Sequence, residues 1–405
     1  MARQTIDDLM RAANCTAYPE RWRTFYDAVM DDFDKNGCAL TDPSYYDALG
    51  DRYGILQNYR DVYKTAAVAV GKNEALSRLL ALLTHALSER ETVSADLKGF
   101  KSPVSPDGKH RIEYDMLTGL AICVLVPYSY EKMKKRGYPE DIIREILATP
   151  EKGIPEYRKR NDGLDGYHLI EWFQRSIEGN LFRMGRLEIE IHAKFSSRAI
   201  VFRNHSGEIC TLAHELDVHR SGDALGMKGC EDEDGAFYAE VVERDDTWRG
   251  HPYLDDARVS ADTVTLPKSE WTEVLRYGDP IVSLHIPGGE PFTSDLVDDA
   301  LKRTKEFLSR YCPDYHYKAF YCGSWLLATE LEEMLGAESN IVKFGKRFYR
   351  QTRKCSGNAV FNFVFLRPNS DVDVATLPEN TRLERAIKRR YLDGKIVREL
   401  AGFFF

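Results

Sequence analysis

The spacing of apolar residues changes from helical to strand-like near the middle of the chain. In the first part, apolar residues recur three and four positions apart, as in ALSRLLALLTHAL at 75–87, which is the spacing of one buried helix face. Another helix is predicted at 138–148, where Pro139 is followed by two acidic residues. The polar, glycine-containing segment at 158–168 interrupts this pattern. We therefore predict a helical domain at 1–165.

Strand patterns and then mixed patterns follow this boundary. Segments that alternate or are rich in strand formers lie at 186–195, 198–204, 208–219 and 236–244, which predicts antiparallel strands joined by turns. From Thr265 onward the pattern predicts, in order, a helix in PKSEWTEVLR, a strand in DPIVSLHIP (279–287), a helix at 294–311, a strand in YHYKAFYC (315–322), a helix in LLATELEEML, strands in NIVKFGKRFY and NAVFNFVFL, and a basic amphipathic helix at 382–400. The predicted fold class is α/β with α+β character, with a mixed-sheet domain at 166–405.

Composition and charge narrow the class of protein. The 405 residues are 43% hydrophobic, enough for two folded domains. A net charge of −8 without a basic footprint argues against a nucleic-acid partner. The N-terminus does not resemble a signal peptide, and the longest apolar run, at 117–126, is about half a membrane span. The eight scattered cysteines include no CxxC pair, so we expect reduced thiols, a cytoplasmic location and no membrane partner. The oligomeric state is left open.

The segment HELDVH at 214–219 contains the residues of a zinc-protease motif at the wrong spacing. That motif requires HExxH on a helix, because histidines four residues apart lie on one face. His214 and His219 are five residues apart, so their side chains diverge in a helix and in a strand alike. We therefore predict a strand end and no metal site. A similar strand, histidine and glycine turn recurs at 281–292, as a structural echo or a chance match.

The strand, turn and helix at 279–311 form the strongest candidate for a functional unit. A glycine turn before a helix exposes backbone N–H groups, which can hold a diphosphate. Here Gly288 and Gly289 form the turn, and the helix begins near Ser294. Against a phosphate stand Pro287, which lacks an N–H, and the acidic residues at 295, 298 and 299 near the helix start. The pattern alone leaves both interpretations open.

Several segments of the chain resemble one protein family. They are the run from SLHIPGGEPF to CGSWLLATEL at 283–331, LPKSEWTEVLRYGDP at 266–280, YPEDIIREIL, and WFQRSIEGNLFRMGRLEIE at 172–190. From about residue 110 onward, the chain resembles a bacterial family of N-acyltransferases with a helical N-terminal domain and a GNAT-like C-terminal domain. The usual GNAT loop signature, a Gln or Arg with two nearby glycines ending in GxG or GxA, is missing here.

This resemblance implies a transfer of the acyl group of acyl-CoA, used as a co-substrate with no tightly bound cofactor, to an amine on a small molecule. Backbone N–H groups of the strand at 279–287 would polarise the thioester carbonyl. The following loop and helix start would bind CoA through Ile286, Gly288, Gly289 and Thr293. The missing signature keeps an alternative open, a non-catalytic GNAT-derived module for ligand binding or regulation.

Four residues are candidates for catalysis. His285, at a strand end, is the first choice for a general base, although it can also simply hydrogen-bond the turn. Glu290, in the turn, is a second possible base or a solvated surface residue. Cys322 and Ser324 flank Gly323 at the end of the next strand, where they can protonate the leaving thiolate or contact a ligand. Since strand ends of α/β sheets leave backbone groups free, we expect these four residues to converge on one ligand.

Overall fold

The computed structural model divides the chain into two compact units, residues 1–183 and 184–405. It describes residues 4–88, 97, 99–168, 172, 175–176, 178–288, 291–367 and 371–405. The domain boundary that the sequence pattern places at 165/166 stays a prediction.

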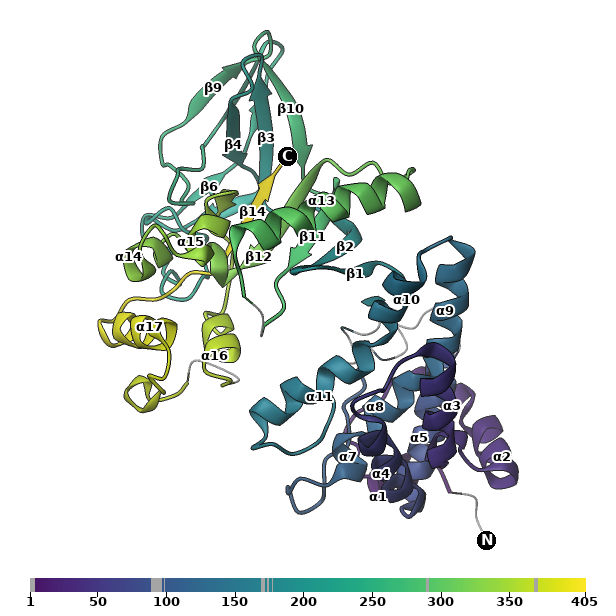
Figure 1. Cartoon of the computed structure of the whole chain (residues 1–405). Helices are drawn as coiled ribbons and strands as arrows, with labels where there is room; N and C mark the ends of the chain where they lie inside the picture. The colour runs from purple at the N-terminus through teal and green to yellow at the C-terminus, as the bar shows by residue number, and fades with distance from the viewer. Residues whose placement is uncertain are drawn as a thin grey trace. The chain divides into compact units, whose positions relative to one another are not determined.

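The first unit is built from helices (Figure 1). They are α1 (Ile6–Ala12), η1 (Glu20–Thr24), α2 (Tyr26–Asn36), η2 (Ala39–Thr41), α3 (Pro43–Tyr53), α4 (Arg60–Gly71), α5 (Glu74–Ser88), α7 (Ile112–Asp115), α8 (Leu117–Ile122), η3 (Cys123–Leu125), α9 (Val126–Lys135), α10 (Glu140–Leu147) and α11 (Thr149–Arg160). The helices predicted at 75–87 and 138–148 are confirmed as α5 and α10.

Local signals explain several helix starts, and burial explains the apolar run. Asp42 accepts a hydrogen bond from the N–H of Ser44 at the start of α3, where Pro43 supplies a preset φ. The run at 117–126 forms α8, η3 and the first residue of α9, and every residue of α8 is buried. This run is therefore part of a protein core. Within the described ranges, no helix is long and apolar enough to cross a membrane.

The second unit is organised around a six-stranded sheet with a parallel pair at its centre, and the first strand of this sheet, β1, crosses the boundary at 183/184. Its strand order is β1 (Leu181–Met184), β2 (Leu187–Lys194), β11 (Pro280–His285), β12 (Ala319–Ser324), β14 (Leu400–Phe404) and β13 (Tyr349–Gln351). β11 and β12 are parallel, whereas β2–β11, β12–β14 and β13–β14 are antiparallel. The first unit is helical and the second contains a mixed sheet with helices, so the predicted α/β class with α+β character is confirmed.

The two faces of this sheet are covered by different structures. One face carries α13 (Ser294–Tyr311), which lies across the central strands in Figure 1. Here the ammonium group of Lys305 lies 5.6 Å from the ring of Phe320. The other face packs on a three-stranded sheet of β10 (Trp271–Arg276), β3 (Ala199–Asn204) and β4 (Ile209–Ala213). Ile281, Ala319, Tyr321, Ala401 and Phe403 point toward that second sheet.

Short strands and helices complete the unit. The strands are β5 (Leu216–Val218) with β6 (Phe237–Ala239), and β7 (Val242–Glu243), β8 (Thr247–Gly250) and β9 (Val264–Pro267). The helices are η4 (Trp325–Leu327), α14 (Leu331–Leu335), α15 (Asn340–Gly345), α16 (Ala359–Val364), η5 (Val374–Thr376) and α17 (Arg382–Leu392). Residues of these helices share one apolar core, in which Trp325 is buried.

Several sequence-based assignments in this unit are wrong. The segment predicted as a helix in PKSEWTEVLR contains β10, because its backbone pairs antiparallel with β3. NIVKFGKRFY begins as α15 and ends in β13, and NAVFNFVFL contains α16, whose buried Val360 and Phe361 join the helical core. The spacing of apolar residues in these short segments fits a strand as well as a helix, so tertiary packing decides their secondary structure.

Other segments are interrupted or end early where one continuous element was predicted; the strand at 236–244, for example, divides into β6 and β7. The strand at 208–219 breaks into β4 and β5 at Glu215, whose φ of 51° turns the chain. LLATELEEML is divided between η4 and α14. The C-terminal helix ends at Leu392, and the chain then returns to the sheet as β14.

Candidate functional site

The central parallel strands separate at their carboxyl ends. β11 and β12 pair over three positions, from Ile281 opposite Ala319 to Ser283 opposite Tyr321. Beyond that point β11 continues to His285 along β2, while β12 continues to Ser324 along β14. The facing edges of the two strand ends therefore have backbone N–H and C=O groups that the parallel ladder does not use. Such a gap at a strand end is where α/β sheets bind ligands.

A buried arginine holds the loop that follows β11. Arg186 lies in the turn between β1 and β2 and is buried. Its Nη1 donates to the carbonyl of Pro287 at 2.7 Å, and its Nε donates to the carbonyl of Pro291 at 2.8 Å. Its guanidinium also lies 4.8 Å from the ring of Phe292. The two ends of the loop are thus fixed by one cation, since charge-assisted hydrogen bonds are strong.

The proposed CoA-binding residues lie along this loop and the start of α13. Ile286 and Gly288 directly follow β11, and Gly288 is exposed. Thr293 is the N-cap of α13, but its side chain makes no capping hydrogen bond. Backbone N–H groups in the first turn are therefore available to another acceptor. Gly289 and Glu290 lie outside the described residues.

Acidic residues near the start of α13 have basic partners. Asp298 binds Nη1 of Arg347, and this hydrogen bond lowers the pKa of the Asp298 carboxyl. Asp299 lies 3.7 Å from Nη1 of Arg303. These cations offset part of the negative charge that argued against a phosphate at this helix start.

His285 has a carboxylate neighbour that the sequence did not suggest. Its Nε2 lies 3.0 Å from Oε2 of Glu190 on β2, and the two side chains are 25% and 20% exposed. An ionised carboxylate only accepts hydrogen bonds, so Nε2 of His285 carries the proton in this pair. The lone pair of a neutral ring then lies on Nδ1. The alternation of Glu188 and Glu190 in RLEIEIH is the signal that marks a polar face of β2.

Cys322 and Ser324 do not meet His285. Along β12, Tyr321 points to the second sheet, so Cys322 points to the opposite face, that of α13. Along β11, Ile281 points to the second sheet, and His285 shares its face. Burial raises the pKa of the Cys322 thiol to about 12. The Ser324 hydroxyl accepts from the N–H of Leu326 at 3.1 Å. The expected convergence of His285 and Cys322 is therefore wrong, because alternation separates them.

The two histidines of HELDVH have separate hydrogen-bonding roles. Nδ1 of His214 accepts from the N–H of Val241 at 3.1 Å. The ring of His219 lies 2.8 Å from the Ser221 hydroxyl and 3.2 Å from Oδ2 of Asp232. In the part of the chain that the structure describes, no cluster of three or more histidine, cysteine or acidic side chains could hold a metal ion.

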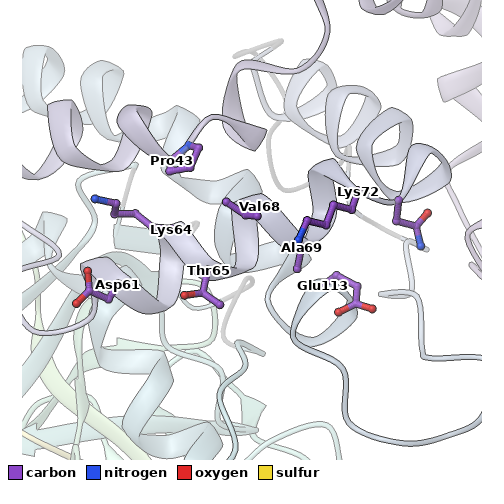
Figure 2. A pocket seen from close by; sticks show the side chains of 9 residues that line it. Pro43, Asp61, Lys64, Thr65, Val68, Ala69, Lys72 and Glu113 are labelled. Atoms are coloured by element: carbon purple, nitrogen blue, oxygen red, sulfur yellow. The ribbon is translucent and has the colours of Figure 1, made fainter.

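A surface pocket of about 780 Å³ lies on the helical unit (Figure 2). It is lined mainly by α4, together with Pro43 of α3, Asn73 and Glu113 of α7. Both acidic and basic side chains line it, and Lys64 pairs with Asp47 at 2.8 Å. None of the candidate catalytic residues lines this pocket.

The architecture places the second unit in a recognisable class, a GNAT-like domain with a parallel central pair that separates at its carboxyl ends. The family model described as a GNAT-like C-terminal domain matches residues 181–404. The chain belongs to this family.

Solved structures resemble the whole chain. One is an acyltransferase in complex with decanoyl-CoA and teicoplanin, with 19% sequence identity, 98% of each chain covered and a TM-score of 0.62. Another is an acyltransferase in complex with decanoyl-CoA, with 16% identity, 99% of each chain covered and the same TM-score. At this identity the likeness shows a shared fold. A comparison with curated proteins finds no match.

Proposed function

We propose that this protein transfers the acyl group of an acyl-CoA to an amine on a small molecule. The observation that carries this proposal is the separation of β11 and β12 beyond Ser283 and Tyr321, directly before a loop that leads into a helix N-terminus. Membership in the GNAT-like family supports it. The similar acyltransferase structures, which contain decanoyl-CoA and in one case teicoplanin, support both the donor and a small-molecule acceptor.

The donor is proposed to lie along the free edge of β11. Backbone N–H groups of this edge would polarise the thioester carbonyl, as preorganised donors do for a developing oxyanion. Ile286, Gly288, Gly289 and Thr293 are the proposed contacts of the CoA diphosphate. Arg186 supports them indirectly, because it fixes the carbonyls of Pro287 and Pro291 and so sets the path of the loop.

The reaction requires one proton to leave the amine and one to reach the thiolate. The amine nitrogen attacks the acyl carbon, the N–C bond forms, and the C–S bond breaks. His285, oriented by Glu190, is the proposed base for the amine proton. Glu290 stays an alternative base, and the Ser324 hydroxyl is the proposed proton donor to the departing CoA thiolate. Cys322 has no proposed proton-transfer role, because its thiol is buried, whereas Ser324 at the end of β12 is partly exposed.

A thiol-release assay with decanoyl-CoA and a panel of amines tests this function. We expect acceptor-dependent release of CoA, and a decrease of roughly 10²-fold or more in rate for His285→Ala. His205→Ala is the matched control, because His205 is exposed and directly follows β3, which belongs to a different sheet from β11. A His285→Ala variant that is folded and fully active would refute the role of His285.

Calorimetry with CoA separates the enzyme from a ligand-binding module. An enzyme should bind CoA and release thiol with at least one amine, whereas a binding or regulatory module would bind CoA without turnover. No heat of binding at millimolar CoA would refute the donor assignment. The eight free cysteines suit a reducing compartment and support a cytoplasmic location.

A further inference from the structure

A guanidinium group lies over the strand β12 where it separates from β11. Arg353 follows β13, and its Nη1 occupies the space in which a Cβ on Gly323 would stand. Gly323 is two residues beyond Tyr321, so this space is on the Tyr321 face of the sheet. That is also the face of His285. The absence of a side chain at Gly323 allows the cation to reach the backbone of β12.

This cation has no anionic partner within the described ranges. Arg353 is only partly exposed, yet no carboxylate or carbonyl accepts a hydrogen bond from its guanidinium there. Nearby arginines differ, since Arg347 binds Asp298 and Arg350 donates to the carbonyl of Asp255. A partly buried guanidinium has five N–H donors to satisfy. The donors that solvent does not reach are unfavourable when unpaired, and a bound ligand can supply their acceptor.

A second polar side chain, Gln351, has no hydrogen-bond partner among the described residues and lies in register with Gly323 across the sheet. Gln351 of β13 is fully buried, and among the described residues neither its Nε2 nor its Oε1 has a hydrogen-bond partner. The strand register pairs Gln351 with Ala401, and Ala401 with Gly323. Directly paired residues share a face, so Gln351 lies on the face that Arg353 covers. The methyl group of Ala401 is small, and two strand spacings, roughly 10 Å, separate the backbones of Gln351 and Gly323.

We propose that Arg353 and Gln351 bind a carboxylate of the acceptor, so that the acceptor is an amine that also carries an anionic group, as an amino acid does. This inference rests on the proposed acyl transfer. An arginine fork matches a carboxylate with two parallel hydrogen bonds, and the Gln351 amide adds a donor. The position of His285 on the same face places the base near the amine of such an acceptor.

The phosphates of CoA are another source of an anion for Arg353. The acceptor is favoured, because Arg353 and the proposed diphosphate site lie on different faces of the sheet. The proposed diphosphate site is the loop at 286–293 with the start of α13, and α13 covers the Phe320 face. Arg353 lies on the opposite, Tyr321 face. A carboxylate on the acceptor and a diphosphate on the donor would thus be held by different groups.

The test uses two product-like probes, N-decanoylglycine and N-decanoylglycinamide, titrated by calorimetry into the full-length protein with CoA present. The acid should bind the wild type at least about tenfold more tightly than the amide, because a charge-assisted hydrogen bond is stronger than a neutral one. Arg353→Gln should abolish this preference, Arg353→Lys should keep part of it, and Arg244→Gln, at an exposed arginine, should leave it unchanged.

Two further variants separate binding from stability. Gly323→Ala should displace the guanidinium and reduce the preference for the acid while the charge remains, which keeps the proposal testable if Arg353→Gln does not fold. Gln351→Leu should raise the melting temperature, because it removes a buried unsatisfied amide, and should weaken binding of the acid. A purely structural Gln351 would give a less stable variant with unchanged binding.

Three results would overturn the proposal: no binding of the acid at millimolar concentration, equal affinities for acid and amide, or an unchanged preference in Arg353→Gln. Weaker CoA binding by Arg353→Gln with an intact preference for the acid would assign the cation to the donor phosphates and also overturn it. The titrations need no turnover. A failure of acyl transfer appears in the thiol-release assay, so the two failures are distinguishable.

Discussion

Replacing Arg398 by methionine should strongly destabilise the second unit. Arg398 lies two residues before the start of β14, and its side chain is 3% exposed. Its guanidinium joins three segments that are distant in sequence, through hydrogen bonds to four acceptors: Asp223 Oδ1 (2.9 Å), the Asp256 carbonyl (2.9 Å), Thr329 Oγ1 (2.6 Å) and Glu330 Oε1 (2.5 Å). Methionine fills a similar volume but offers none of these donors.

The expected magnitude follows from the carboxylates that remain. Asp223 is buried and keeps Arg258, whose Nε lies 3.1 Å from its Oδ2. Glu330 loses its ion-pair partner, and its Oε2 is already buried without a hydrogen bond in the described structure. Removing one partner of a buried ion pair costs about 3–5 kcal/mol. For a unit of this size each kcal/mol lowers Tm by roughly 2–4 °C, so we expect a decrease of roughly 6–20 °C.

Thermal unfolding followed by circular dichroism measures this effect. Arg258→Met is the matched control: it contacts the same Asp223, but its side chain is 40% exposed, so we expect a loss of at most about 1 kcal/mol. Adding Asp223→Asn and Glu330→Gln to Arg398→Met should recover part of the loss, because the uncompensated charges disappear. A loss for Arg398→Met no larger than that of the control would refute this reasoning.

Three further predictions concern the site and its surroundings. Arg186→Met should raise the KM for acyl-CoA about tenfold in steady-state kinetics, because it releases the two carbonyls of the loop after β11; an unchanged KM would show that the loop holds its path without this cation. Because burial raises the pKa of Cys322 to about 12, iodoacetamide at pH 8 should not alkylate this thiol, as measured by mass spectrometry. Cys322→Ala should keep kcat within about threefold of the wild-type value. Rapid alkylation of Cys322 would contradict its burial. Arg347 lowers the pKa of Asp298 below its ordinary 3.8, so this pair stabilises the fold above that value and loses its effect as the pH falls through the lowered pKa. The difference in Tm between wild type and Arg347→Ala, equivalent to at most about 1 kcal/mol of stability, should therefore be present at pH 7 and vanish in acid. A difference that grows in acid would contradict the assignment.

The elements that carry the site could be predicted because their local signals are strong. DPIVSLHIP is flanked by turn residues and forms β11, and the regular apolar stripe at 294–311 forms α13. Local signals were weaker elsewhere. The segment at 271–276 becomes a strand only because β3 offers an antiparallel edge, and the sequence Leu400–Phe404 has no alternation that distinguishes a strand from a loop.

The arrangement of side chains at the site was harder to predict. His285 was identified from its place at a strand end, but its partner Glu190 lies 95 residues earlier in the chain. Cys322 was misplaced for a simple reason: alternation along two parallel strands depends on their register, which the sequence does not reveal. Arg353 and Gln351 follow an element that was predicted with the wrong boundaries, so nothing in the pattern connected them to His285.

The position of β14 between β12 and β13 has a consequence for how the protein is synthesised. These neighbours are complete once residue 351 has left the ribosome, but the strand that joins them begins only at Leu400. Until then, β12 and β13 present unpaired edges, which can pair with other chains. The sheet closes through contacts of long sequence separation, and such contacts form slowly. A nascent chain paused between these positions should therefore depend on chaperones, and synonymous changes in translation speed over 352–399 should alter the yield of folded protein.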